Sequence, residues 1–96
     1  MAYRNTPDTL LAKQDIQDVL ARYARGVDRA DGPLLHSCYW DDAIEEHGSS
    51  YAGPARAYVD GAIARLATMD VLCHYVCNIH VELQGEALAY VESYLL

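Results

Sequence analysis

The alternation of apolar and polar residues between positions 71 and 84 constrains the fold most strongly. Apolar residues occupy every odd position of this stretch: Val71, Cys73, Tyr75, Cys77, Ile79, Val81 and Leu83. Polar residues fill most of the even positions. A period of two is the side-chain period of a β-strand, so one long strand with an apolar and a mostly polar face is predicted. Gln84-Gly85-Glu86 can form a turn, after which residues 87–96 are predicted to return as a second strand.

A helix is predicted ahead of this hairpin, with Thr6 as its cap, Pro7 in its first turn and its end before Gly32-Pro33. Its apolar residues recur at spacings of three and four: Ile16, Val19, Leu20, Tyr23, Ala24 and Val27. A short helix is expected over residues 34–39, an irregular strand or hairpin over 43–51, and a third helix after Gly53-Pro54. The third helix should bury Val59, Ala62, Ile63 and Leu66. Helices followed by antiparallel strands indicate an α+β domain, with the helices packed on one face of a sheet.

Length and charge exclude several classes of protein. The chain has 96 residues, which fits one domain over residues 1–96, and its net charge is −7. This acidity disfavours nucleic acid as a partner. No apolar run is long enough to span a membrane, and the N-terminus has no signal-peptide core. Three cysteines are an odd number and suit a reducing compartment. We therefore expect a cytoplasmic protein that binds neither membranes nor nucleic acid.

No metal site is expected from the cysteines and histidines of the predicted strand. Cys73, Cys77 and His80 would converge on a helix, but on a strand the cysteines face away from His74 and His80. The acidic residues 41, 42, 45 and 46 are typical of a solvated loop and strand edge. The sequence also contains no glycine-rich phosphate-binding motif and no nucleophile elbow.

His74 is a candidate for acid–base chemistry. It shares its side of the predicted strand with Leu72, Val76 and Asn78. A histidine among apolar residues that face a helix layer is either a hydrogen-bonded core residue or a general base. The periodicity alone leaves both interpretations open.

Asp28 is the candidate partner of His74. It follows Ala24 by one turn, on the flank of the apolar stripe of the first helix, from which a carboxylate could reach the sheet. It could equally be a solvated residue in the last helical turn, where it opposes the helix dipole. Asp31 is an alternative to Asp28 as the partner of His74, because its angular position around the helix is also suitable. It also makes a natural cap before Gly32-Pro33. If Asp28 and His74 meet, the carboxylate fixes the tautomer while the other ring nitrogen removes a substrate proton.

Several short motifs, taken in order, resemble the SnoaL-like domains of the nuclear transport factor 2-like superfamily. They are Ile16-Gln17-Asp18, Gly26-Val27-Asp28, Trp40-Asp41-Asp42-Ala43 with the strand region that continues to Gly48, Gly53-Pro54, and His74-Tyr75 with Asn78. The resemblance covers residues 10–96. It implies a cone-shaped α+β barrel, in which a curved antiparallel sheet, wrapped by the N-terminal helices, encloses a pocket. Because the final strands of the family have no counterpart, the domain is expected to be truncated at its C-terminus.

Some members of this superfamily are lyases, including scytalone dehydratase and hexachlorocyclohexane dehydrochlorinase. The Asp–His pair of these enzymes matches Asp28 and His74, which the resemblance therefore implies are catalytic. The dehydrochlorinase has a lysine where Tyr23 stands, and scytalone dehydratase has a second histidine near the position of Glu92. The C-terminal arginine of the dehydrochlorinase has no counterpart, so stabilisation of the leaving group must differ.

We therefore expect a cofactor-independent lyase, dehydratase or isomerase that acts on a small apolar cyclic molecule, with no metal. Its expected substrate-binding residues are Tyr23, Trp40, Tyr51, Leu72, Val76, Asn78 and Glu92. The odd-numbered apolar stripe predicts a homodimer or higher oligomer formed through the sheet. The alternatives are a non-catalytic binding or dimerisation module, an inactive fragment, or the small subunit of a ring-hydroxylating dioxygenase, because the fold alone does not determine the function.

Overall fold

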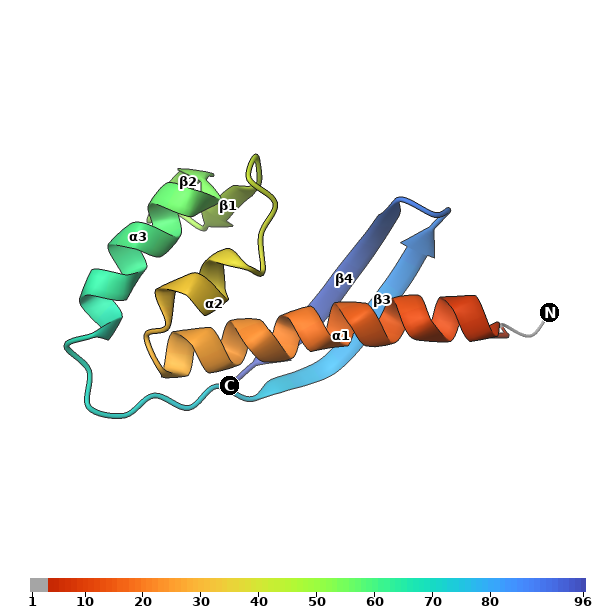
Figure 1. Ribbon diagram of the computed structural model, residues 1–96, viewed down its shortest axis with the longest axis horizontal. Coiled ribbons are helices and arrows are strands. Elements are labelled where there is room, and N and C mark those ends of the chain that lie inside the picture. The colour runs from red at the N-terminus through yellow and green to blue at the C-terminus, as the bar shows by residue number, and fades with distance from the viewer. Residues whose placement is uncertain (1–3) are drawn as a thin grey trace.

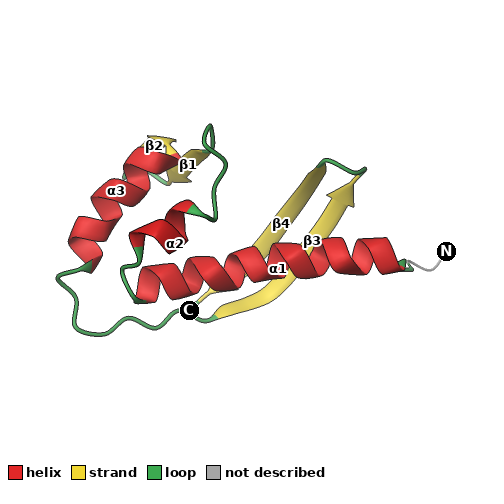
Figure 2. Cartoon of the chain, in the orientation of Figure 1, coloured by secondary structure: helices red, strands yellow, loops and turns green. Residues whose placement is uncertain are grey.

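The computed structural model describes residues 4–96, which form helices and two β-hairpins (Figures 1 and 2). In chain order the elements are α1 (Pro7–Asp28), α2 (Gly32–His36), β1 (Ile44–His47), β2 (Tyr51–Pro54), α3 (Ala55–Leu66), β3 (Val76–Gln84) and β4 (Leu88–Leu95). The predicted α+β class is confirmed. The strands of residues 4–96 form two separate two-stranded sheets, β1–β2 and β3–β4.

The ends of α1 follow from local hydrogen bonds. The Thr6 side chain accepts the backbone N–H of Thr9 at 3.2 Å, and the Thr9 hydroxyl accepts the Thr6 N–H at 2.8 Å, which closes a reciprocal cap. At the other end α1 stops at Asp28, and Asp31 caps α2 by accepting the Leu34 N–H at 3.0 Å. Asp31 therefore serves as the cap of α2 and not as the partner of His74.

The turn between α1 and α2 depends on Gly26. This residue is buried, and a Cβ placed on it would lie 2.8 Å from Cγ of Leu35, closer than carbon atoms can approach. The Gly26 carbonyl also accepts the Asp31 N–H at 2.9 Å. The missing side chain lets α2 pack directly on the C-terminal end of α1, next to Asp28.

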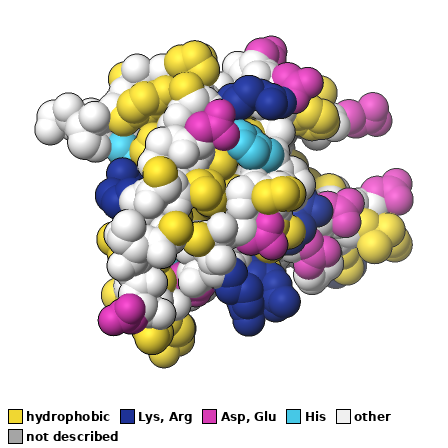
Figure 3. All heavy atoms as spheres, turned by 60° about the vertical axis from the view of Figure 1, so that its left-hand side comes forward, with side chains coloured by type: hydrophobic (Ala, Val, Ile, Leu, Met, Phe, Trp, Pro, Cys, Tyr) yellow, Lys and Arg dark blue, Asp and Glu magenta, His cyan; other side chains and the backbone are white. Residues whose placement is uncertain are grey.

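The core is small and lies between α2 and α3. Leu35 and Val59 are each 2 % exposed, and Ala55 and Ala62 are also buried. Val59 and Ala62 confirm the predicted inner face of α3, while Ile63 and Leu66 are half-buried. Many other hydrophobic side chains reach the surface among charged ones, as the face in Figure 3 shows. The packing therefore leaves apolar walls that solvent can reach.

The long strand predicted from residue 71 is interrupted by a β-bulge. Strand β3 begins at Val76, and its register with β4 shifts between Cys77 and His80. Asn78 lies in this bulge with φ of 51°, a conformation that asparagine tolerates better than most residues. One extra residue exchanges the two faces of a strand. The prediction of a single continuous apolar face is therefore wrong.

The exposure of side chains on the two sides of the bulge shows this exchange. Before it, the even-numbered residues 72, 74 and 76 are half-buried, while Val71 is 85 % and Tyr75 is 62 % exposed. After it, the odd-numbered residues 79, 81 and 83 are the half-buried ones. The side chains at positions 72 and 74 thus point inward, although the sequence pattern assigns them to the polar face.

The elements divide into two groups along α1, in a molecule that measures 50 × 27 × 25 Å. The β3–β4 hairpin crosses α1, whereas α2, α3 and the β1–β2 hairpin gather at the C-terminal end of this helix (Figure 1). The segment from residue 67 to residue 75 joins the two groups and brings His74 against α1. Within residues 4–96, none of the helices has both the length and the apolarity needed to cross a membrane.

Candidate active site

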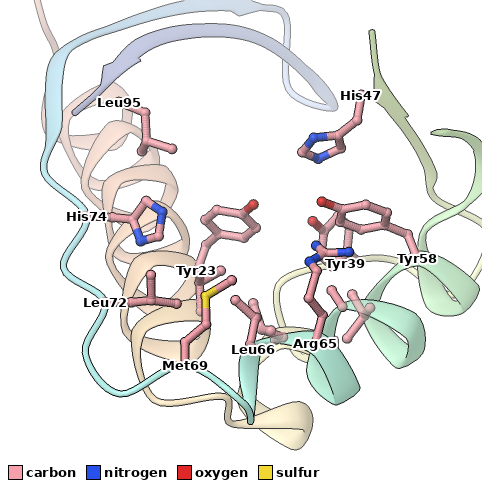
Figure 4. Close-up of a pocket in the computed structure, with 14 residues that line it drawn as sticks. Tyr23, Tyr39, His47, Tyr58, Arg65, Leu66, Met69, Leu72, His74 and Leu95 are labelled. Carbon is pink, nitrogen blue, oxygen red and sulfur yellow. The ribbon is translucent and has the colours of Figure 1, made fainter. Parts of the chain in front are cut away.

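A cavity of about 280 Å³ lies between the two groups of elements. Its walls come from the C-terminal half of α1, from α2, α3 and β1, and from the segment that carries His74, with Leu95 of β4 at one edge (Figure 4). This volume lies just below the roughly 300–1,000 Å³ range of ligand pockets. The cavity is therefore suited to a small molecule.

Asp28 and His74 meet at one side of this cavity. Nδ1 of His74 lies 2.5 Å from Oδ1 of Asp28, and the backbone N–H of His74 donates to Oδ2 at 3.1 Å. The carboxylate therefore holds both the ring and the main chain of the same residue. His74 lines the cavity, whereas Asp28 lies behind it, outside the lining.

These hydrogen bonds determine the charge of Asp28 and the tautomer of His74. Burial raises the pKa of Asp28, but the two hydrogen bonds from His74, with the nearby charges of His74 and Arg29, outweigh it and lower the pKa below its ordinary value. An ionised carboxylate only accepts hydrogen bonds, so Nδ1 of a neutral His74 carries the proton. Nε2 then keeps its lone pair, and no residue within 4–96 forms a hydrogen bond with it. The arrangement can accept a proton at Nε2.

The wall next to His74 is apolar. Met69 and Leu72 lie on the same side of the cavity as the imidazole, and Leu66 lies at the bottom of the cavity between Met69 and Arg65 (Figure 4). The Tyr23 ring extends from α1 toward the opposite side. Burial, followed by the charges of Tyr58, Glu45 and Cys38, raises the pKa of Tyr23, so its hydroxyl stays protonated and can donate a hydrogen bond.

The wall opposite His74 is polar. Tyr39, Tyr58, His47 and Arg65 gather there, with their polar ends toward the cavity (Figure 4). Burial and a hydrogen bond to Glu45 strongly raise the pKa of Tyr39. The cavity thus has an apolar side with one imidazole and a second side that is rich in hydrogen-bond donors.

Three of the residues predicted from the sequence line the cavity, namely Tyr23, Leu72 and His74. Asp28 supports His74 from behind. Val76 follows His74 on the inward-facing side but lies outside the cavity lining, because the chain has by then entered β3.

The other expected substrate-binding residues lie outside the lining of this cavity. Trp40 is 85 % exposed in the loop after α2. The Tyr51 hydroxyl donates to the Pro54 carbonyl at 2.8 Å and closes the β1–β2 hairpin. Asn78 is exposed because the bulge turns it outward, and Glu92 is exposed on β4 opposite His80. None of these four side chains reaches the cavity.

Several cavity residues were missed by the sequence analysis. Tyr58 and Arg65 belong to the face of α3 that also buries Val59 and Ala62, so the helical period contains a signal for them. His47 and Tyr39 carried no such signal, because the orientation of a short hairpin and of a loop depends on tertiary packing. Within the described residues, no group of three or more metal-ligating side chains comes together.

Comparison with known protein families gives one match. The family described as "SnoaL-like domain" matches residues 8–96, nearly the whole chain and all of the elements that build the cavity. Comparison with curated proteins and with solved structures finds no match.

Proposed function

The chain belongs to the SnoaL-like domain family, and from this premise we propose that it is a cofactor-independent lyase or isomerase with His74 as its general base. The observation that carries the proposal is the hydrogen bond between Asp28 and Nδ1 of His74 at the cavity wall. The proposed substrate is small, largely apolar and cyclic, in keeping with the cavity volume and with Leu66, Met69 and Leu72.

The proposed reaction begins with proton abstraction. Nε2 of His74 takes a proton from a carbon next to an electron-withdrawing group such as a carbonyl. Asp28 keeps the lone pair of Nε2 directed to the cavity and stabilises the imidazolium that forms. The electron pair of the broken C–H bond then either expels a leaving group from the neighbouring carbon or is reprotonated at another carbon. The first route is an elimination and the second an isomerisation.

Hydrogen exchange with solvent tests this base directly. Small cyclic ketones, with cyclohexanone as the first probe, are incubated with the protein in D₂O, and loss of the α-proton signal is followed by NMR. His74→Gln should slow enzymatic exchange by about 10²–10⁴-fold, the usual contribution of a general base. His36→Gln is the matched control, because His36 also pairs with a carboxylate, Asp60, but lies outside the cavity. Equal rates in wild type and His74→Gln would refute the proposal.

A non-catalytic assembly module is the second candidate, favoured by exposed apolar side chains on β4. Leu88, Tyr90 and Tyr94 are all exposed and, at even positions of the strand, share one face of β4; this surface replaces the odd-numbered stripe, which the bulge divides. We propose a homodimer through this strand in a cytoplasmic protein. A stable dimer by size-exclusion chromatography with light scattering, together with no exchange on any ketone, would favour assembly over catalysis.

A further inference from the structure

The solvent-exposed side of α1 carries a regular pattern of charges that neither the core nor the cavity uses. Its residues recur at alternating spacings of three and four: Asp8, Leu11, Asp15, Asp18, Arg22, Arg25 and Arg29. All seven are exposed, whereas Ile16, Leu20 and Val27 on the other side of the helix are half-buried. This heptad spacing places the seven residues, here called the charged stripe, on one face of α1. In Figure 1 this helix lies in front of the β3–β4 hairpin.

The charges of this stripe have no ionic partner in the described structure. Within residues 4–96, none of its aspartates and arginines takes part in an ion pair, and Asp18 accepts only the Gln14 amide at 2.9 Å. The helix dipole favours acidic residues in the first turn and basic residues in the last turn, and its effect falls off beyond these turns. Asp15, Asp18 and Arg22 lie between them, so the dipole does not account for the separation of charge along α1.

The order of the charges makes the stripe complementary to its own reverse. The N-terminal half contains three aspartates and the C-terminal half three arginines, so the stripe is neutral in a chain whose net charge is −7. An acidic partner would be attracted by one half and repelled by the other, and the same holds for a basic partner. A second α1 that runs in the opposite direction matches both halves. Elsewhere on the surface, the net charge makes two copies repel each other.

We propose that two copies of this chain associate through the charged stripes of antiparallel α1 helices. In antiparallel heptad packing, the a positions of one helix face the d positions of the other. With the stripes centred on each other, Asp15 faces Arg25 of the second copy and Asp18 faces Arg22, and the two-fold axis repeats both contacts. At each end Leu11 lies against the aliphatic stem of Arg29. The alignment therefore leaves no pair of like charges in contact.

This association is distinct from a dimer through β4 and is independent of the proposed role of His74. Exposed ion pairs are individually weak and are screened by salt, so the α1 dimer should be weak and should dissociate as the salt concentration rises. The β4 surface is apolar around Leu88, Tyr90 and Tyr94, and association there does not weaken with salt. Salt dependence thus separates the two surfaces.

Charge reversal of the stripe tests the pairing by analytical ultracentrifugation. Wild type should dimerise at about 0.05 M salt and dissociate at about 0.5 M salt. Arg22→Asp/Arg25→Asp makes the stripe acidic and Asp15→Arg/Asp18→Arg makes it basic. Each double variant alone should raise the dissociation constant of the dimer by about 10-fold or more, because every ion pair becomes a repulsion. An equimolar mixture of the two variants should form a heterodimer, since each acidic position then faces a basic one.

A matched control separates this pairing from a general effect of net charge. Lys13→Asp/Arg56→Asp changes the net charge by the same amount as Arg22→Asp/Arg25→Asp but lies outside the stripe, so the dimer should persist. Circular dichroism confirms that α1 is folded in every variant.

Three results would overturn the proposal. Wild type could stay monomeric at low salt and at protein concentrations of about 500 µM, which would mean that the stripe binds no second copy. A dimer could persist in both double variants of the stripe, which would place the interface elsewhere. The two double variants could also fail to associate when mixed, which would contradict the antiparallel pairing. None of these results changes the α-proton exchange expected of His74.

Discussion

Two Asp–His pairs in this molecule have nearly the same chemistry and very different surroundings. Asp28 and His74 lie 2.5 Å apart with side chains 18 % and 26 % exposed, and Asp28 also accepts the His74 backbone N–H. His36 and Asp60 lie 2.8 Å apart, but the Asp60 side chain is 68 % exposed and only one hydrogen bond joins the two residues. The first pair borders the cavity, whereas the second joins the surfaces of α2 and α3.

The comparison shows that residue types alone do not make a site. An exposed pair contributes little because water and salt screen it and because its side chains lose rotamer freedom. Asp28 is different because it is fixed by two hydrogen bonds and because the ring that it holds lines the cavity. We therefore expect that changes at the first pair affect function and that the same changes at the second pair do not.

Replacing the carboxylates of the two pairs should give the largest difference. Asp28→Asn removes the acceptor that fixes the proton on Nδ1 of His74, and an amide can pair with the wrong tautomer. Turnover or α-proton exchange should fall by about 10²–10⁴-fold, as for loss of a general base. Asp60→Asn is the matched control and should retain the wild-type rate. Similar losses of turnover or exchange rate in both variants would mean that a position next to the cavity does not make the first pair functionally different from the second.

A glycine substitution tests the packing that places Asp28. Gly26→Ala puts a methyl group 2.8 Å from Cγ of Leu35, and overpacking of this kind costs about 1–3 kcal/mol. The urea midpoint should fall, and the displaced end of α1 should weaken the contact with His74. Gly61→Ala is the control, since it meets nothing within 4 Å on α3 and alanine favours a helix by up to about 1 kcal/mol. A stable Gly26→Ala protein would contradict the close approach of α1 and α2.

The smallest expected effect is a difference in acid stability. Because the pKa of Asp28 is lower in the folded than in the unfolded protein, its ionised form contributes stability above the unfolded value of about 3.9. This contribution is lost as the pH falls through the lowered folded value. The urea midpoint of Asp28→Asn should therefore depend less on pH than that of wild type between about pH 5 and about pH 2. Asp60→Asn serves as the comparison, and an unchanged dependence in Asp28→Asn would count against the hydrogen-bonded carboxylate.

The sequence pattern was sufficient to predict the α+β class, whereas the pairing of Asp28 with His74 was left open by the pattern and was implied only by the resemblance to SnoaL-like domains. The spacing of apolar residues in α1 places Asp28 on the flank of its inner stripe, and the cap of α2 accounts for the rival Asp31. The period of two in the second half predicts a hairpin. These features are local, so the sequence pattern contains them.

The rest depends on contacts between distant residues. The bulge at Asn78 has a weak local signal at most, yet it decides which side chains of β3 face inward. Trp40 has a large aromatic side chain, which favours burial, but it lies in the loop after α2 and is 85 % exposed. The polar wall forms because β1 is folded back beside α3, which stacks His47 on Tyr58. No spacing within one element could have predicted that contact.

The most direct test of the central claim is the tautomer of His74, measured by ¹⁵N NMR of the imidazole ring at neutral pH. The account predicts that Nδ1 carries the proton, that Nε2 has the chemical shift of an unprotonated nitrogen, and that Asp28→Asn changes both signals while Asp60→Asn changes neither. A proton on Nε2, or a His74 ring that does not respond to Asp28→Asn, would contradict the assignment of His74 as a base oriented by Asp28.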